Sequence, residues 1–295
     1  DDYFAFVTTF TPPAPLNFDI KRTSGITYSS IISTGNTMGW TGTSTDEQVS
    51  PTVSIPSSTF TYQGQIVTGF NMSTNGFLKL VTAGSGAITS ANLSNVFGAS
   101  PVPYVIAPFW EDLSTNPNSS ITAKLDSSTR YQIIGSTVGS RKIVAEWANF
   151  KAFSGNGGKL NFQVVMDESD NSISFNYGPM QGYNSTNDFT YSYSCGLGGL
   201  LANGFPLPGQ VLAQQYENSD AFSNSFAHTT NIGANALRVL PESNSSIKFT
   251  PGTYAGFNIP SNTPPANDNT SGAIKLATVT SFPNHLGSMN YSTRF

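Results

Sequence analysis

The sequence predicts an all-β protein, an antiparallel β-sandwich with long loops that is jelly-roll-like or contains a meander. Short apolar runs recur at spacings of roughly 8–14 residues with turn residues between them, which is typical of sandwiches and barrels. Charged residues make up 10% of the 295 residues, whereas an ordinary soluble domain has roughly 25%. Ser, Thr and Asn fill the polar positions instead, and these side chains favour turns and strands over helices.

The strands can be placed in order along the chain. The dipeptide Asn75-Gly76 lies between the apolar runs 70–73 and 77–80 and predicts a tight hairpin. Two strand-like runs follow at 105–113 and 142–150, and they contain two of the three tryptophans. A meander is predicted from residue 120, with strands at 121–125, 131–134, 143–150, 160–166 and 173–177. No stretch is a convincing amphipathic helix, and only residues 203–220 are ambiguous enough to hold one short helical turn.

The end of the chain predicts a change of module. Residues 246–249 form the last expected strand, so the sandwich is assigned to residues 1–253. Residues 254–270 are rich in Pro and Asn and predict an extended linker. Residues 271–295 begin a new apolar run, and we expect either the start of a second β module or a strand-donating tail.

Composition excludes several classes of partner. The formal charge is 13 − 17 = −4 and basic patches are missing, so we expect no nucleic-acid partner. No run reaches the ~20 apolar residues that a membrane helix needs, which predicts no membrane insertion. Cys195 is the only cysteine, so no intrachain disulfide can form. With no basic residue nearby in sequence to activate its thiol, Cys195 is interpreted as a buried apolar residue.

The inventory of catalytic residues is thin. His228 and His285 are far apart, and neither a zinc-type His spacing nor a Gly-x-Ser-x-Gly nucleophile turn is present. The best catalytic hypothesis is a glycosidase that pairs Glu111 or Asp112 with Glu146, because sugar hydrolysis needs two carboxylates. The favoured interpretation is that these acids cap strand ends or accept backbone hydrogen bonds. The adjoining Trp110 and Trp147 are then core residues. We therefore predict a non-enzymatic protein with no catalytic and no cofactor-binding residues.

Two binding hypotheses rest on loops. Residues 167–171 (Asp-Glu-Ser-Asp-Asn) offer hard oxygen ligands that would suit Ca²⁺. A plain hairpin turn is favoured over a metal site there, because Asp and Asn stabilise turns through local hydrogen bonds. Residues 183–193 mix Tyr with Asn, Asp and Ser, which suits sugar recognition, although aromatic residues on strands are more often packed. Glycosylation sequons, many of them chance matches in so Asn-rich a chain, occur at Asn71, Asn92, Asn118, Asn184, Asn244, Asn269 and Asn290.

Several short motifs together resemble a known family. They lie at 25–28, 60–64, 73–77, 106–112, 146–149, 162–165, 173–178 and 249–251. This set resembles a secreted β-sandwich module of Bacteroidetes surface proteins exported by a type IX route, and it is similar in motif to the nidogen-like extracellular domain. The resemblance covers residues 20–270 and implies an extracellular or cell-surface location. The phrase at 264–269 resembles the lead-in to a next module, where Thr270 replaces a frequent cysteine.

Three functions remain open at this point. The first is a non-catalytic interaction or structural module of a bacterial adhesin-type protein, with a protein or glycan as partner. The second is a self-assembling filament subunit, in which residues 273–280 or the alternating run 3–10 add as a strand to a neighbouring copy. The third is a carbohydrate-binding or glycan-hydrolysing jelly roll. We favour the first function, and the second is the runner-up.

Overall fold

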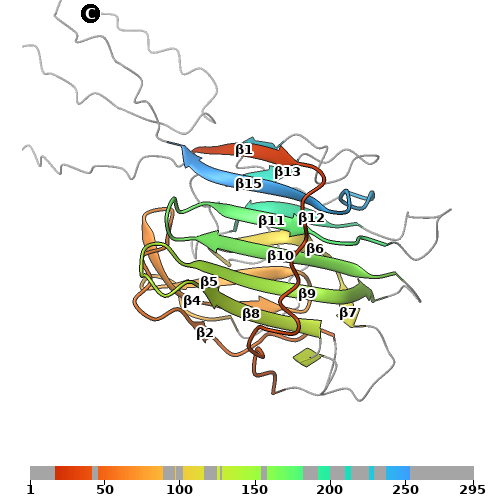
Figure 1. The fold of residues 1–295 in the computed structure, drawn as a ribbon, viewed down its shortest axis with the longest axis horizontal. Coiled ribbons are helices and arrows are strands. Elements are labelled where there is room, and N and C mark those ends of the chain that lie inside the picture. Colours follow the sequence, from red (N-terminus) through yellow and green to blue (C-terminus); the bar gives the residue numbers. More distant parts are fainter. Residues whose placement is uncertain are drawn as a thin grey trace, which may run out of the picture.

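A computed structural model describes residues 17–41, 46–88, 97, 102–115, 125–126, 128–153, 158–181, 192–199, 210–213, 226–228 and 237–252. Within these residues the chain is nearly all β and forms two antiparallel sheets (Figure 1). The predicted all-β sandwich is therefore confirmed. The linker at 254–270, the segment 271–295 and the run 3–10 lie outside the described residues, so the assignments made for them stay predictions.

The first sheet, the β9 sheet, has the strand order β1-β15-β11-β10-β9-β7, and β8 also pairs with β9. Its strands are β1 (Asn17–Thr23), β7 (Leu113–Thr115), β8 (Thr129–Ile134), β9 (Lys142–Ala152), β10 (Leu160–Asp167), β11 (Ile173–Tyr177) and β15 (Ser245–Gly252). The successive pairing of β8, β9, β10 and β11 is the predicted meander.

The second sheet, the β6 sheet, has the order β14-β13-β12-β6-β5-β4-β2, and β3 also pairs with β4. Its strands are β2 (Val53–Ser54), β3 (Thr61–Tyr62), β4 (Gln65–Ser73), β5 (Phe77–Thr82), β6 (Val105–Trp110), β12 (Ser194–Gly198), β13 (Val211–Ala213) and β14 (Phe226–His228). Among the described residues, no helix is long and apolar enough to cross a membrane.

One local prediction was wrong, and one ambiguous stretch is resolved in part. Leu125 was expected to end a strand, but it lies in a short helical turn. Its carbonyl oxygen accepts a hydrogen bond from the Thr129 hydroxyl at 2.7 Å, which stabilises that turn. Residues 203–220 were ambiguous in the sequence, and their described part, residues 210–213, contains β13, which pairs with β12. Tertiary pairing outweighs the ambiguous local sequence there.

The predicted hairpin at Asn75-Gly76 is confirmed, with one extra residue in its loop. Ser73 pairs with Phe77, so three residues connect β4 to β5. Gly76 has a φ of +76°, the left-handed conformation that such a loop requires. Its tip is not on the surface: the indole Nε1 of Trp147 donates to the Ser73 carbonyl oxygen at 2.8 Å. The hairpin therefore ends inside the sandwich.

Apolar side chains of both sheets meet in one core. Phe162 on β10 stacks on Trp147 at a ring-centroid distance of 5.0 Å and reaches Phe109 on β6 at 5.8 Å. Trp110 points to the other side of the β6 sheet, where it packs on Phe77 at 4.6 Å in a separate cluster. Both tryptophans are thus buried as predicted, but in different clusters. Because both faces of β6 are covered, all six of its residues are buried.

The segment that follows β1 covers the outer face of the β9 sheet. It crosses that face from β1 towards β8 (Figure 1). Near its start the Ile26 amide donates to the Asn244 carbonyl oxygen at 2.8 Å, and near its end Asn36 bridges to Tyr131 on β8. This covering segment, residues 24–41, explains how a polar strand position on the outer face can be buried.

Candidate functional site

Glu146, half of the hypothetical glycosidase pair, is fully buried beneath the covering segment. Its two carboxylate oxygens accept hydrogen bonds from the Tyr28 hydroxyl at 3.0 Å and from the Ile31 backbone amide at 2.6 Å. Loss of hydration raises the pKa of the Glu146 carboxyl. The carboxylate therefore anchors the covering segment to β9.

Glu111, the proposed partner acid, lies where the chain passes from β6 to β7. Its carboxylate accepts a hydrogen bond from the Ser192 amide at 2.7 Å, just before β12. Burial raises the pKa of Glu111 to about 7. Glu111 thus holds the residue before β12 of the β6 sheet, whereas Glu146 holds the covering segment on the outer face of the β9 sheet. Both accept backbone hydrogen bonds, which is one of the roles that the favoured interpretation of the sequence predicts for these acids.

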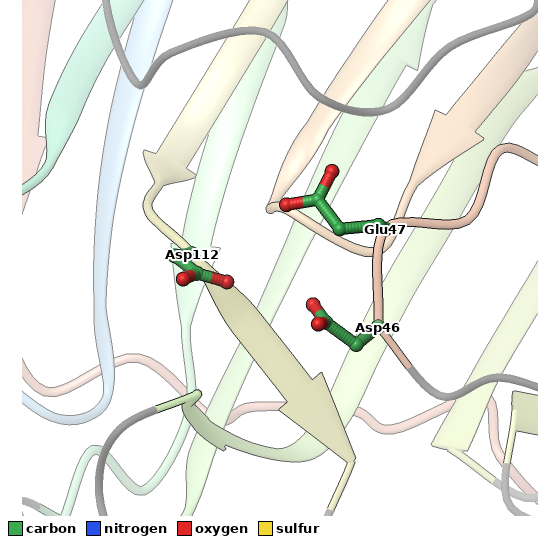
Figure 2. A group of neighbouring side chains, drawn as sticks. All are labelled: Asp46, Glu47 and Asp112. Atoms are coloured by element: carbon green, nitrogen blue, oxygen red, sulfur yellow. The ribbon is translucent and has the colours of Figure 1, made fainter.

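A different group of acids does come together. Asp46, Glu47 and Asp112 each place a carboxylate oxygen within 4.8 Å of the others (Figure 2). Asp112 follows β6, whereas Asp46 and Glu47 precede β2, and Figure 2 shows Asp46 and Asp112 facing each other. Asn75 at the buried hairpin tip joins them, because its amide Nδ2 donates to Glu47 at 3.2 Å. The same side chain accepts the Leu113 amide at 3.3 Å.

The charges in this acidic cluster oppose one another. Burial, followed by the charges of Asp112 and Glu47, raises the pKa of Asp46 to about 6. Burial also raises the pKa of Asp112. The ammonium group of Lys151 partly offsets the repulsion at Asp46. Carboxylates in this arrangement are the hard oxygen ligands that suit Ca²⁺ or Mg²⁺. Within the part of the chain that the structure describes, these three residues could hold a divalent cation.

Asp46→Asn is expected to stabilise the protein at pH 8 and to change little at about pH 3, below the unfolded pKa. The folded-state pKa of about 6 lies above the ordinary value of 3.8. Folding therefore favours the protonated carboxyl. Its full contribution to stability is present below 3.8, the pKa in the unfolded chain, and it is lost as the pH rises through about 6, the pKa in the folded protein. Because Asp46 is partly exposed, we expect a gain of no more than about 1 kcal/mol. Calorimetric melting at both pH values measures it.

The matched control is Asp19→Asn, which neutralises an exposed carboxylate on β1. It should not reproduce the gain at pH 8. The prediction would be contradicted if Ca²⁺ raised the melting temperature of the wild-type protein and Asp46→Asn abolished that rise. In that case the cluster holds a cation, and the loss of its carboxylate is destabilising whenever the ion is present.

The turn at 167–171 connects β10 to β11, and its side chains bond to protein groups. The Asp167 carboxylate accepts the Ser169 amide at 2.9 Å. Asp170 pairs with Lys248 at 2.8 Å, and Asn171 accepts the Thr61 amide at 2.7 Å. The segment thus forms the hairpin turn between two paired strands, and its side chains also hold distant segments.

Tyr193, at the end of the segment considered for sugar binding, is a core residue. Its ring stacks on Phe109 with centroids 4.0 Å apart, and its hydroxyl donates to the Val239 carbonyl oxygen at 2.7 Å. Residues 182–191 lie outside the described residues. Cys195 is buried as predicted, with its Sγ 3.5 Å from the Tyr177 hydroxyl.

The structure describes only some of the histidines and glycosylation sequons that the sequence analysis considered. His228 ends β14, where the structure describes only the backbone, and His285 lies outside the described residues. The sequon at Asn71 is buried, with 2% of the residue exposed, so it is closed to modification in the folded protein. Asn244 is exposed. The other five sequons lie outside the described residues: Asn92, Asn118, Asn184, Asn269 and Asn290.

Comparison with known proteins places the whole sandwich in one family. A family model described as "NIDO related" matches residues 17–251, from the first residue of β1 into β15. Neither the curated proteins nor the solved structures gave a match. The match agrees with the nidogen-like part of the resemblance in the sequence, and it indicates a domain of extracellular type. Because it spans both sheets and most of the chain, this protein belongs to the NIDO-related family.

Proposed function

We propose that this chain is a non-catalytic interaction module of an extracellular, adhesin-type surface protein. The observation that carries the proposal is the use of Glu146 and Glu111 as buried acceptors of backbone hydrogen bonds. A catalytic acid has to reach a substrate, and a carboxylate that holds two chain segments together is committed to the fold. Membership of a domain family of extracellular type supports the location.

The finer features of the proposal rest on the sequence. The motif resemblance supports a bacterial surface protein, and a type IX export route would follow from the same resemblance. The partner is a protein or a glycan on a surface or in a matrix. A chain in which only 10% of the residues are charged offers little for nonspecific electrostatic capture. Selectivity then has to come from the shape and hydrogen-bonding groups of the loops.

The test is binding without turnover. The full chain is immobilised and exposed to a panel of matrix proteins and polysaccharides, with binding followed by interferometry. Release of reducing ends is measured in parallel on the same polysaccharides. We expect saturable binding to at least one surface polymer and no release of reducing ends. Hydrolysis by the wild-type chain that disappears in Glu146→Gln would overturn the non-catalytic proposal.

Filament formation is the second candidate function, and one observation favours it. Asn17 at the start of β1 pairs with Gly252 at the end of β15. Asn17 and Gly252 therefore lie side by side at one corner of the β9 sheet, where β1 is the edge strand. A strand from a neighbouring copy could add to that edge. However, β1 exposes Asp19 and Lys21, and charges on edge strands commonly oppose such pairing. Light scattering on the samples used for binding separates monomers from polymers.

A further inference from the structure

The outer face of the β9 sheet carries a hollow of about 540 Å³. The covering segment forms one wall through Tyr28, and β9 and β10 form the floor. The chain after β11 and the loop before β15 complete the lining with Gln181 and Asn244. This volume is in the range of small-molecule sites. The hollow is distinct from the acidic cluster, with which it shares no residue.

The aromatic wall of the hollow is fixed from two sides. The Tyr28 hydroxyl donates to the buried Glu146 carboxylate at 3.0 Å. The Tyr28 ring also lies directly over Gly178, because a Cβ atom at that glycine would be 2.8 Å from the ring carbons. The absence of a side chain at position 178 therefore lets the ring approach the sheet. An immobilised tyrosine offers a large contact surface at little cost in conformational entropy.

The rim of the hollow is built from amide side chains. Asn149, Gln181 and Asn244 are all exposed. Asn149 and Asn244 have φ values of 57° and 58°, the left-handed conformation, which asparagine adopts more readily than most residues with a side chain.

The surrounding structure holds both left-handed asparagines in place. The backbone amide of Asn149 donates to Asn161 Oδ1 at 3.0 Å. The Nδ2 atom of Asn161 in turn donates to the Pro179 carbonyl oxygen at 2.7 Å. The Asn244 carbonyl oxygen accepts the Ile26 amide at 2.8 Å. The backbone of both asparagines is thus fixed, and both residues line the hollow and are exposed.

We propose that this hollow binds one ring of a neutral saccharide, an inference that rests on the proposed function and names its ligand class. Side-chain amides both donate and accept hydrogen bonds, as neighbouring sugar hydroxyls do. The fixed tyrosine ring supplies the apolar surface for the C–H face of the sugar. Lys159 is the one exposed charged residue among the lining residues, and the Glu146 carboxylate is already bonded. A neutral ligand fits this balance better than an anion, which would call for clustered arginines.

The test uses calorimetric titration of the full chain with xylohexaose, cellohexaose, chitohexaose and, as an anionic probe, hexagalacturonate. The main variant is Asn149→Gly with Asn244→Gly, because glycine keeps the left-handed backbone and removes only the amides. We expect at least one neutral hexasaccharide to bind, and the double variant to bind it about tenfold more weakly, the loss expected for two hydrogen bonds. Gln181→Ala, a single exposed site, should weaken binding in the same direction.

The matched control is Asn171→Gly, the same substitution at a left-handed asparagine (φ 53°) outside the hollow. It should bind as the wild type does. Unchanged affinity in the hollow variants, absence of neutral-saccharide binding, or exclusive binding of hexagalacturonate would each overturn the inference. If the chain still binds proteins in the surface panel, only the saccharide site fails. If it binds neither class, the proposed function fails as well.

Discussion

Gly76→Ala is expected to destabilise the domain by about 3–5 kcal/mol, close to the limit for a single substitution. A Cβ atom at this position would overlap the carbonyl oxygen of Phe109 and lie 3.1 Å from the Leu113 side chain. The first of these neighbours is backbone of β6, which cannot move away independently. The φ of +76° adds strain for any residue with a side chain. Urea denaturation gives the free energy of unfolding.

Gly64→Ala is the control that separates conformation from space. Gly64 has nearly the same φ, +75°, but a Cβ atom there would meet nothing within 4 Å. Its expected cost is the left-handed strain alone, about 1–2 kcal/mol. The difference between the two variants measures how tightly the hairpin tip packs on β6. Equal losses would contradict the close approach of Gly76 to Phe109.

The sequence predicted the features that depend on neighbours along the chain. The Asn-Gly signal located the β4–β5 hairpin, and regularly spaced turns located β8 to β11. The sequence did not reveal that the hairpin tip is internal, with Ser73, Thr74 and Asn75 almost fully buried. Polar residues in a turn normally predict exposure. Only tertiary contacts, such as that from Trp147 to Ser73, show otherwise.

The acidic cluster and the hollow could not be predicted in the same way. From the sequence, Asp112 was considered only as an alternative partner of Glu146. Its neighbour Asp46 belongs to a loop with no distinctive pattern and meets Asp112 only in the folded chain. The hollow depends on a covering segment that has little regular secondary structure, and on the small size of Gly178 beneath Tyr28. The buried position of Glu146 likewise depends on that segment, because its strand neighbours alone do not enclose it.

Glu168→Gln is expected to cost about 3–5 kcal/mol, because it leaves the charge of Arg141 buried without a counter-ion. The Glu168 carboxylate accepts Arg141 Nε at 2.8 Å and Nη2 at 2.6 Å, and it also accepts the Thr59 and Gly139 amides. Arg141 donates further to the Pro56 carbonyl oxygen at 3.0 Å. One ion pair therefore joins three turns at one end of the sandwich.

The same pair predicts an acid transition. The hydrogen bonds from Arg141 lower the pKa of Glu168 from 4.5 to about 2. A lowered folded-state pKa gives stability that is present above the unfolded pKa and is lost as pH falls through the folded one. Wild-type stability should therefore fall between pH 4.5 and 2, and Glu168→Gln should lack this component. Urea denaturation across that pH range measures both.

Asp170→Asn is the matched control, because it removes an ion pair of similar length, 2.8 Å to Lys248, in the same turn. That pair is exposed, with 38% and 36% of its two side chains accessible, so the expected loss is at most about 1 kcal/mol. The double variant Arg141→Met, Glu168→Leu should be more stable than Glu168→Gln, because it removes both buried charges together. If the double variant is instead the least stable of all, the hydrogen bonds to the three turns matter more than charge neutralisation does.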